Sequence, residues 1–303
     1  MITRRQLLSG ATVLAVAGVS ALSAGCAREG DAMTVRLAAG EEGGFYHAFA
    51  VLLAREAAGA GIRVHVLTTA GSRENLMLLA AGNADVALVL ADSLAEDPQR
   101  PPAIGRVYEN YLQLAVAPDS TFRGVADLRG ARLNLGATGS GAAASGVKLL
   151  AAAGVGVEEV TVTHLPLPEA VSALTQGRSE ALLWAGGVPT AALNGLRLLD
   201  LGPLAPAMRE RFGYLYDPVL IAAGTYPGMP AVHTIGVANL LVASANLADS
   251  TVAALTEVLL THADSLVPAE AAGTQFLDAR SLIGTGTVAL HPGAAAVYRR
   301  HHG

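Results

Sequence analysis

Residues 131–150 read ARLNLGATGSGAAASGVKLL, and this stretch decides how the chain is expected to fold. Its first letters form an apolar strand pattern, glycine and hydroxyl residues follow, and the alanine-rich end is typical of a helix. A strand that turns directly into a helix leaves free backbone N–H groups at the helix start, where the helix dipole also favours negative charge. The stretch therefore predicts a loop that binds an anion.

Two nucleotide-binding loops can be tested against this stretch. A mononucleotide P-loop requires Lys after its last glycine, but Gly141 is followed by Ala142. A dinucleotide fingerprint fits in its letters, because Gly139, Gly141 and Ala144 spell G-x-G-x-x-A. It also requires an acid at the end of the next strand to hold a ribose hydroxyl, and that strand ends in HLP at residues 164–166. Neither class fits.

A nucleophile elbow is excluded as well, because Thr138 and Ala142 stand where G-x-S-x-G needs glycines around Ser140. What remains is a site for a small anion such as a carboxylate. Backbone N–H groups of residues 139–142 and the hydroxyls of Thr138 and Ser140 would hold it. The alternative is a glycine turn that only starts a helix.

The first residues, MITRRQLLSGATVLAVAGVSALSAGC, indicate export. Arg4 and Arg5 precede a short apolar run, residues 7–22, that glycine and serine interrupt. This suits a signal peptide over residues 1–25 better than a membrane span. The arginine pair resembles a Tat-type export signal.

Cys26 is the only cysteine of the chain, so no internal disulfide can form. The letters LSAGC resemble a lipobox, in which this cysteine carries lipid, although Ser23 replaces the usual leucine. We expect a tether over residues 26–32 and a body anchored by lipid to the outer face of the cytoplasmic membrane. The alternative is a cysteine without lipid beside an ordinary cleavage site.

Composition narrows the function classes. The chain has 303 residues and a net charge of −5, and no basic run follows the signal peptide, which makes nucleic acid an unsuitable partner. Eight histidines form no HExxH pattern, so neither a metal site nor a cofactor is expected. We expect a protein that binds a solute and is not an enzyme.

Strand and helix patterns alternate twice along the chain. MTVRLAAG, IRVHVLTTAG and DVALVLADS read as strands separated by helical patterns, and the same order returns further on. The sequence therefore predicts an α/β fold of two lobes. Residues 33–119 with about 236–303 form the first lobe and residues 120–235 the second, with a ligand cleft between them at the carboxyl ends of the strands.

Loops at these strand ends supply the candidate ligand-binding residues. Glycines allow the backbone to approach a ligand, aromatic residues can line a wall, and hydroxyls, amides and a carboxyl can form hydrogen bonds. The candidates are Gly44, Phe45, Tyr46, Ser72, Asn75, Asp92, Ser93, Thr138, Gly139, Ser140, Gly141, Ala142, Trp184 and Gly186.

Several candidates have a structural alternative. Either Ser72 or Asn75 is expected to cap the helix that starts there, and Phe45 or Trp184 can simply pack in the core. Glu41 and Glu42 precede the first glycine loop, where they would repel a carboxylate, so we expect them to face solvent. The alternative is that the ligand carries a cationic group.

Five segments together resemble the extracytoplasmic solute receptors of the TAXI branch of TRAP transporters. These are GGFYHAFAVLLA, TTAGSRENLMLLAAGNADVALVLAD, VADLRGARLNLGATGSG, AAGTYPGMPAVHTIGVANLLVAS and ALHPGAAAVYRR. They are distributed along the mature chain, so that the resemblance extends over nearly all of it. The chain departs from the pattern at Glu41 and Glu42, where glycine and threonine are usual, and at LADS, which replaces Q-S-D.

This resemblance implies a two-lobed periplasmic-binding-protein fold of type II. It also implies a receptor that captures a small organic anion, a glutamate-like amino acid or a dicarboxylate, and delivers it to a TRAP-type membrane permease. Two alternatives stay open: a receptor of the same fold that serves a sensor or an ATP-driven importer, and an exported enzyme.

Overall fold

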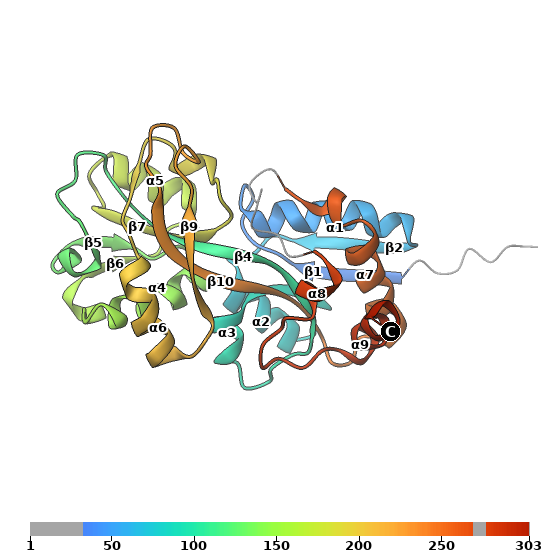
Figure 1. Ribbon diagram of the computed structural model, residues 1–303. Coiled ribbons are helices and arrows are strands. Elements are labelled where there is room, and N and C mark those ends of the chain that lie inside the picture. The colour runs from blue at the N-terminus through green and yellow to red at the C-terminus, as the bar shows by residue number, and fades with distance from the viewer. Residues whose placement is uncertain (1–32, 269–276, 303) are drawn as a thin grey trace, which may run out of the picture. The chain divides into compact units, whose positions relative to one another are not determined.

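The computed structural model describes residues 33–268 and 277–302 (Figure 1). The expected signal peptide, the tether and Cys26 lie outside these residues. Within them, strands follow the order β2-β1-β3-β10-β4-β7-β5-β6 in one sheet, and β8 and β9 pair with β4 and β10.

The first half of the sheet consists of parallel strands with helices between them. The strands are β1 (Met33–Ala38), β2 (Ile62–Leu67) and β3 (Val86–Leu90). All five residues of β3 are buried, as expected for a strand covered on both faces. The connecting helices are α1 (Phe45–Gly59) and α2 (Ser72–Ala80), and α3 (Ala91–Ala95), α7 (Asp249–Thr261), α8 (Ala279–Leu282) and α9 (Pro292–His302) complete this half.

The second half repeats the arrangement. Its parallel strands are β5 (Arg132–Asn134), β6 (Thr161–Thr163) and β7 (Ala181–Gly186), joined by α4 (Gly141–Ala152) and α5 (Leu167–Thr175). The remaining elements are β8 (Arg197–Leu198), α6 (Ala205–Phe212) and β9 (Tyr216–Ile221). Short 3-10 turns occupy Val125–Leu128, Val157–Glu159, Ala191–Leu193, Gly202–Leu204 and Ala263–Leu266.

Two long antiparallel strands, β4 (Ala103–Val116) and β10 (Val232–Ala243), run through both halves (Figure 1). Residues 239–243 of β10 pair with β3, whereas residues 232–237 pair with β9. Strand β4 pairs with β7 over residues 111–116. Register irregularities in the β4–β10 pair follow Asn239 and Leu241, and such irregularities bend a strand.

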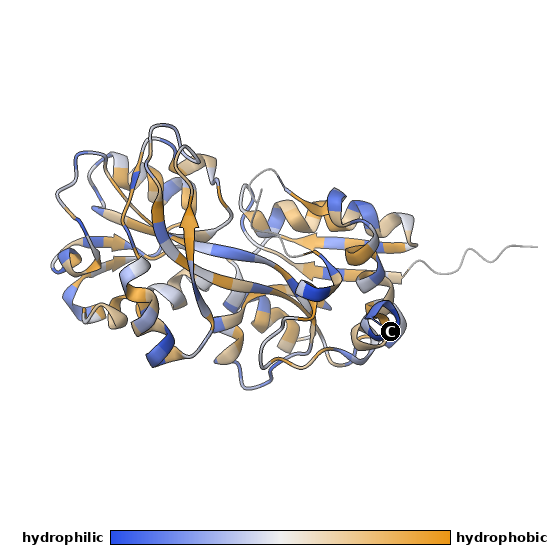
Figure 2. Ribbon diagram, viewed as in Figure 1, coloured by the Kyte–Doolittle hydropathy of each residue, from blue (hydrophilic) through white to orange (hydrophobic). Residues whose placement is uncertain are grey.

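Each half has its own hydrophobic core. Phe49, Tyr108 and Leu255 belong to the cluster of the first half, and Leu135 and Leu183 to a cluster of the second. Each large side chain buried in this way contributes about 1.5–3 kcal/mol to folding. Figure 2 shows hydrophobic residues along the strands of both halves, whereas hydrophilic residues lie mainly on outer helix turns and loops. The alternation of strands and helices predicted from the sequence is therefore present.

Candidate functional site

A pocket lies where the carboxyl ends of strands from both halves meet. The empty space among its walls is about 490 Å³, part of it open to solvent. Its walls are Gly40, Glu41, Gly44, Phe45, Tyr46, Ala70, Gly71, Ser72 and Leu90 from the first half, Asn110 from β4, and Gly136, Ala137, Ser140, Gly141, Ala142, Trp184, Ala185 and Gly186 from the second.

The start of α4 faces this pocket with hydrogen-bond donors. Ser140 is the N-cap residue, and its Oγ accepts a hydrogen bond from the N–H of Ala143 (3.2 Å). Its hydroxyl proton is therefore free to point elsewhere. Among the described residues, the N–H groups of Gly141 and Ala142 have no protein acceptor. These three donors at the positive end of a helix of 12 residues can hold an anion.

The neighbouring residues of this loop have other positions. Thr138 is exposed and does not line the pocket. The carbonyl of Gly139 accepts hydrogen bonds from the N–H groups of Arg73 (3.1 Å) and Glu74 (3.3 Å), at the start of α2. The loop of the second half thus contacts the first half directly and closes one side of the pocket.

Gly71 allows these two loops to approach each other. Its φ of +118° is one that residues with a side chain rarely adopt, and a Cβ there would lie 3.6 Å from the Cα of Ser140. Gly71 is also the N-cap of α2, which has no side-chain cap. The prediction that Ser72 or Asn75 caps this helix is therefore wrong, because both side chains are engaged elsewhere.

Tyr46 and Ser72 form one wall of the pocket. The Tyr46 hydroxyl donates to Oδ1 of Asn239 and lies 3.2 Å from Oγ of Ser72, which accepts from the N–H of Leu90 (3.0 Å). Burial raises the pKa of Tyr46 well above its usual value, so the phenol stays neutral. Phe45 packs against Tyr108 and also touches the pocket.

Asn75 does not line the pocket. Its Nδ2 donates to the carbonyls of Ala39 (2.6 Å) and Leu88 (2.8 Å), and its Oδ1 accepts from Thr69 Oγ1 (2.6 Å). Both the nitrogen and the oxygen of its amide therefore bond to other groups of the protein and not to a ligand. Asn75 ties together the chain after β1, the chain after β2 and strand β3.

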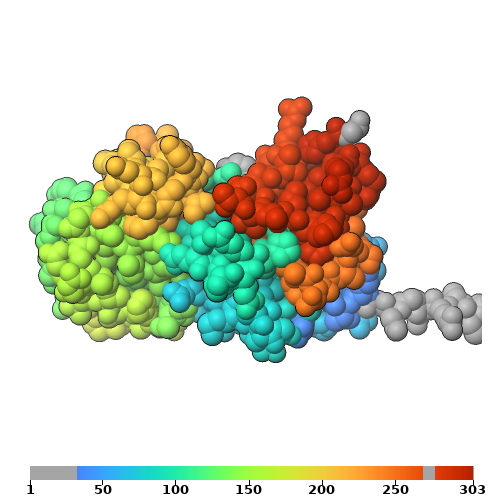
Figure 3. Space-filling model, turned by 90° about the horizontal axis from the view of Figure 1, so that it is seen from below, coloured from blue at the N-terminus to red at the C-terminus, as the bar shows by residue number. Residues whose placement is uncertain are grey.

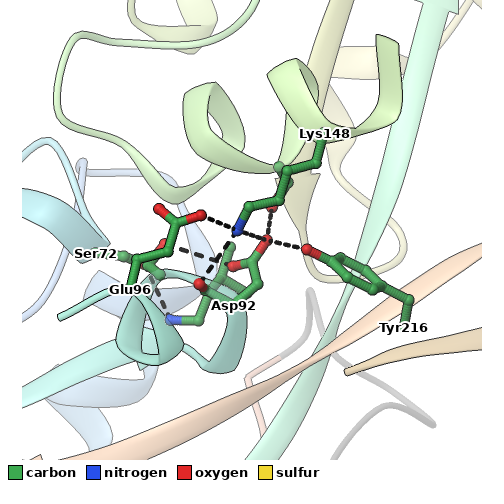
Figure 4. A network of polar contacts seen from close by, with 8 residues as sticks. Ser72, Asp92, Glu96, Lys148 and Tyr216 are labelled. Atoms are coloured by element: carbon green, nitrogen blue, oxygen red, sulfur yellow. Dashed lines mark hydrogen bonds and ion pairs between the residues drawn. The ribbon is translucent and has the colours of Figure 1, made fainter. Parts of the chain in front are cut away.

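Asp92 and Ser93 also lie away from the pocket, on α3. Figure 4 shows Lys148 of α4 and Tyr216 of β9 pointing toward Asp92, which has 0% exposed surface. Its Oδ2 accepts from Ser145 Oγ (2.6 Å) and Tyr216 OH (3.1 Å), and Lys148 Nζ lies 3.6 Å from it. Burial, with the Asp92 charge adding to it, raises the pKa of Tyr216 well above its usual value, so it remains a donor.

Lys148 extends this network to the surface, where its Nζ lies 2.8 Å from Glu96. Figure 3 shows the teal atoms of α3 against the yellow-green atoms of α4 on this face. The network of Asp92, Glu96, Ser145, Lys148 and Tyr216, named here the α3–α4 network, is thus a second contact between the halves.

The expectation that Glu41 and Glu42 both face solvent is wrong for Glu41. Glu42 is exposed as expected, but Glu41 is half-buried, lines the pocket, and accepts a hydrogen bond from the N–H of Leu167 at the start of α5 (3.2 Å). Burial, with Glu169 nearby, raises the pKa of Glu41, although the Leu167 N–H opposes this shift. Glu41 turns inward because the start of α5 offers a donor from the other half.

Asn110 is a pocket residue that the sequence reasoning missed. It lies on β4, its Nδ2 donates to the carbonyl of Ala185 (3.1 Å), and its buried Oδ1 has no partner among the described residues. Its strand also contains Arg106, Glu109 and Gln113, so no local pattern distinguishes Asn110 as a pocket residue. Trp184 lines the pocket with its indole N–H bound to Thr190 Oγ1 (3.0 Å).

Among the residues that the structure describes, no helix is both long and apolar enough to cross a bilayer. In the same part of the chain, no group of three or more His, Cys, Asp and Glu side chains is arranged to hold a metal ion.

Comparison with known proteins adds a family and a fold. A family model described as NMT1-like matches residues 37–301. A protein of Bordetella bronchiseptica RB50 is similar in structure, with a TM-score of 0.56, 15% identity, and coverage of 89% of this chain and 98% of that one. A Xanthomonas citri protein solved with ATP is similar as well, with a TM-score of 0.50 and 13% identity. The match covers 89% of this chain and 98% of that one.

The periplasmic aliphatic sulphonate-binding protein SsuA of Escherichia coli is also similar, with a TM-score of 0.47, 17% identity, and coverage of 77% of this chain and 68% of that one. The likeness to the first two structures extends over most of both chains. The predicted α/β class is confirmed: the described residues form a mixed α/β fold, and the likeness to the Bordetella bronchiseptica structure, at 15% identity, concerns the fold alone.

Proposed function

We propose that this chain, which belongs to the NMT1-like family, is a solute-binding receptor outside the cytoplasmic membrane. It captures a small organic anion, a glutamate-like amino acid or a dicarboxylate, and delivers it to a TRAP-type secondary transporter. The observation that carries this proposal is the start of α4, where Ser140, Gly141 and Ala142 present donors to a pocket between the two halves.

The physical argument is the strength of hydrogen bonds to a charged group. Each such bond contributes about 1.5–3 kcal/mol, and the helix dipole adds to the attraction for a carboxylate. Because donors of α4 and the wall formed by Tyr46 and Ser72 come from different halves, a bound solute would contact both. This arrangement suits a receptor that closes on its ligand.

We further propose that the chain forms two lobes with the boundaries expected from the sequence. Residues 33–119 and about 236–303 form the first lobe, residues 120–235 form the second, and the ligand cleft lies between them. Strands β4 and β10 pass through both halves, and the irregular register after Asn239 and Leu241 marks a place where they can bend. Lipid on Cys26 would hold the receptor at the membrane surface.

The experiment is mass spectrometry of the solute that co-purifies with the exported chain. We expect a small carboxylic acid, unchanged after purification, to be released on denaturation. An enzyme would instead release a converted product, and that result would contradict the proposal. A neighbouring gene for a TRAP permease would support the transporter, whereas genes of an ATP-driven importer would point to the alternative partner.

A further inference from the structure

The pocket contains a negative charge and no positive side chain. Among its lining residues, the ionisable side chains are Glu41 and Tyr46, and Tyr46 is neutral. No ion pair joins Glu41 to a basic side chain in the part of the chain that is described. A half-buried carboxylate without a cation is costly, since water no longer solvates it fully.

Asn110 adds a second acceptor. Its side chain is 4% exposed, and its Oδ1 is buried without a partner among the described residues. The orientation of its amide follows from the carbonyl of Ala185, which must face Nδ2 and not Oδ1. Asn110 lines the pocket, and its Oδ1, which can only accept a hydrogen bond, has no donor among the described residues.

The start of α4 supplies the opposite polarity. Ser140, Gly141 and Ala142 offer donors, whereas Glu41 and Asn110 offer acceptors in the same pocket. A dicarboxylate would satisfy the donors, but it would leave Asn110 Oδ1 without a donor. It would also place a negative charge in a pocket that already contains Glu41, whose carboxylate accepts only the Leu167 N–H among the described residues.

We propose that the ligand carries a protonated amino group, which lies against Glu41 and Asn110 while its carboxylate meets the start of α4. The ligand class is therefore an amino acid and not a dicarboxylate. This inference rests on the proposed function and chooses between its two solute classes. The aromatic wall of Trp184 is compatible with it, because an ammonium group is attracted to an indole face.

One other role of Glu41 has to be separated from this one. The hydrogen bond from Leu167 N–H joins Glu41 to the second half, so the carboxylate could simply hold the two halves together. In that case Glu41 would strengthen the binding of every ligand equally. An ammonium partner, in contrast, makes its effect depend on the amino group of the ligand.

The experiment is a cycle that changes both the protein and the ligand. Calorimetry measures the binding of the twenty amino acids, and of the carboxylic acids obtained by removing their amino group, such as glutarate for L-glutamate. The proteins are the unaltered chain, Glu41→Gln, and Glu42→Gln as a control at the exposed neighbour. Thermal melting and circular dichroism verify that each variant is folded.

We expect at least one amino acid to bind at least tenfold more tightly than its deaminated counterpart, and Glu41→Gln to remove most of this preference. Glu42→Gln should keep it. Equal weakening of both ligands by Glu41→Gln would overturn the inference in favour of a contact between halves. Tight binding of a dicarboxylate without amino-acid binding would also overturn it and leave the proposed function standing. Binding of neither class would refute both.

Discussion

At the scale of single residues, Glu109 has an unusual environment. It lies on β4 with 5% exposed surface, 3.4 Å from Arg106 Nη2, and near Asp217 of β9, which pairs with Arg209. Burial is the main cause that raises the pKa of Glu109 to about 7, with Asp217 adding to it and Arg106 opposing it. The folded protein therefore binds this proton more tightly than the unfolded chain does.

This environment predicts a pH dependence of stability. Because the folded-state pKa is raised from 4.5 to about 7, the contribution of Glu109 to the free energy of unfolding is fully present below pH 4.5 and is lost as pH rises through 7. Glu109→Gln should remove this slope and gain about 1–3 kcal/mol relative to the unaltered chain at pH 8. Urea denaturation at pH 5 and pH 8 measures it, with Glu42→Gln as control. An unchanged slope in Glu109→Gln would contradict the assignment.

Ser140 has two roles that a second prediction can separate. Ser140→Ala removes the hydroxyl that we propose to bind the ligand carboxylate, and it removes the side-chain cap of α4. We expect ligand affinity to fall by roughly 1.5–3 kcal/mol and folding stability by about 1 kcal/mol. Calorimetry with the co-purified solute and thermal melting measure the two effects. Thr138→Ala, at an exposed position outside the pocket, is the matched control. If both variants are folded and bind the ligand with unchanged affinity, the loop does not bind the ligand and only starts helix α4.

At the scale of elements, the start of α4 must fit closely against the first half. A Cβ on Gly141 would lie 2.4 Å from Leu90 Cδ1 and 2.7 Å from Ser72 Oγ, well inside contact distance. Gly141→Val should therefore hold the two halves apart and weaken ligand binding by more than Ser140→Ala does, since all contacts across the pocket are affected. Calorimetry compares the two variants. Equal or smaller loss in a folded Gly141→Val variant would show that the contact is not required.

The α3–α4 network gives a prediction for the same pair of elements. Lys148 is largely buried and is the cation beside Asp92, so Lys148→Met would leave a buried carboxylate that retains only hydroxyl donors. We expect a loss of about 3 kcal/mol in the free energy of unfolding. Glu96→Gln removes the exposed member of the network and should cost under about 1 kcal/mol. Urea denaturation that gives equal losses for the two variants would contradict this assignment.

At the scale of the whole molecule, the expected anchor at Cys26 lies outside the described residues but can be tested directly. Cys26→Ala should be exported and recovered in the soluble extracytoplasmic fraction, because a lipid on this residue is the anchor that we propose. Membrane fractionation followed by immunoblotting measures the distribution. Glu29→Gln, which lies in the expected tether and keeps the cysteine, is the control. A Cys26→Ala protein that still sediments with membranes would refute the lipid anchor.

The sequence by itself determined the α/β class and the position of the turn before α4. Both follow from local patterns: apolar strands at short intervals, helical periodicity, and glycines with hydroxyl residues where a strand ends. Parallel strands place their carboxyl ends at one edge, so many of the loops expected at the cleft do line the pocket. Tyr46, Ser140, Trp184 and Gly186 are among these residues.

Only the tertiary structure decided which side chains of those loops face the pocket. Glu41 turns inward because the N–H of Leu167 donates to it, and this donor lies 126 residues away in the chain. Asp92 turns away from the pocket because Ser145 and Lys148 approach it from the other half. Asn110 reaches the pocket from the middle of a strand, where no local pattern marks it. Such contacts depend on how the two halves of the sheet and their loops meet. A periodic pattern within either half contains no information about that meeting, because it reports only which residues of an element are buried.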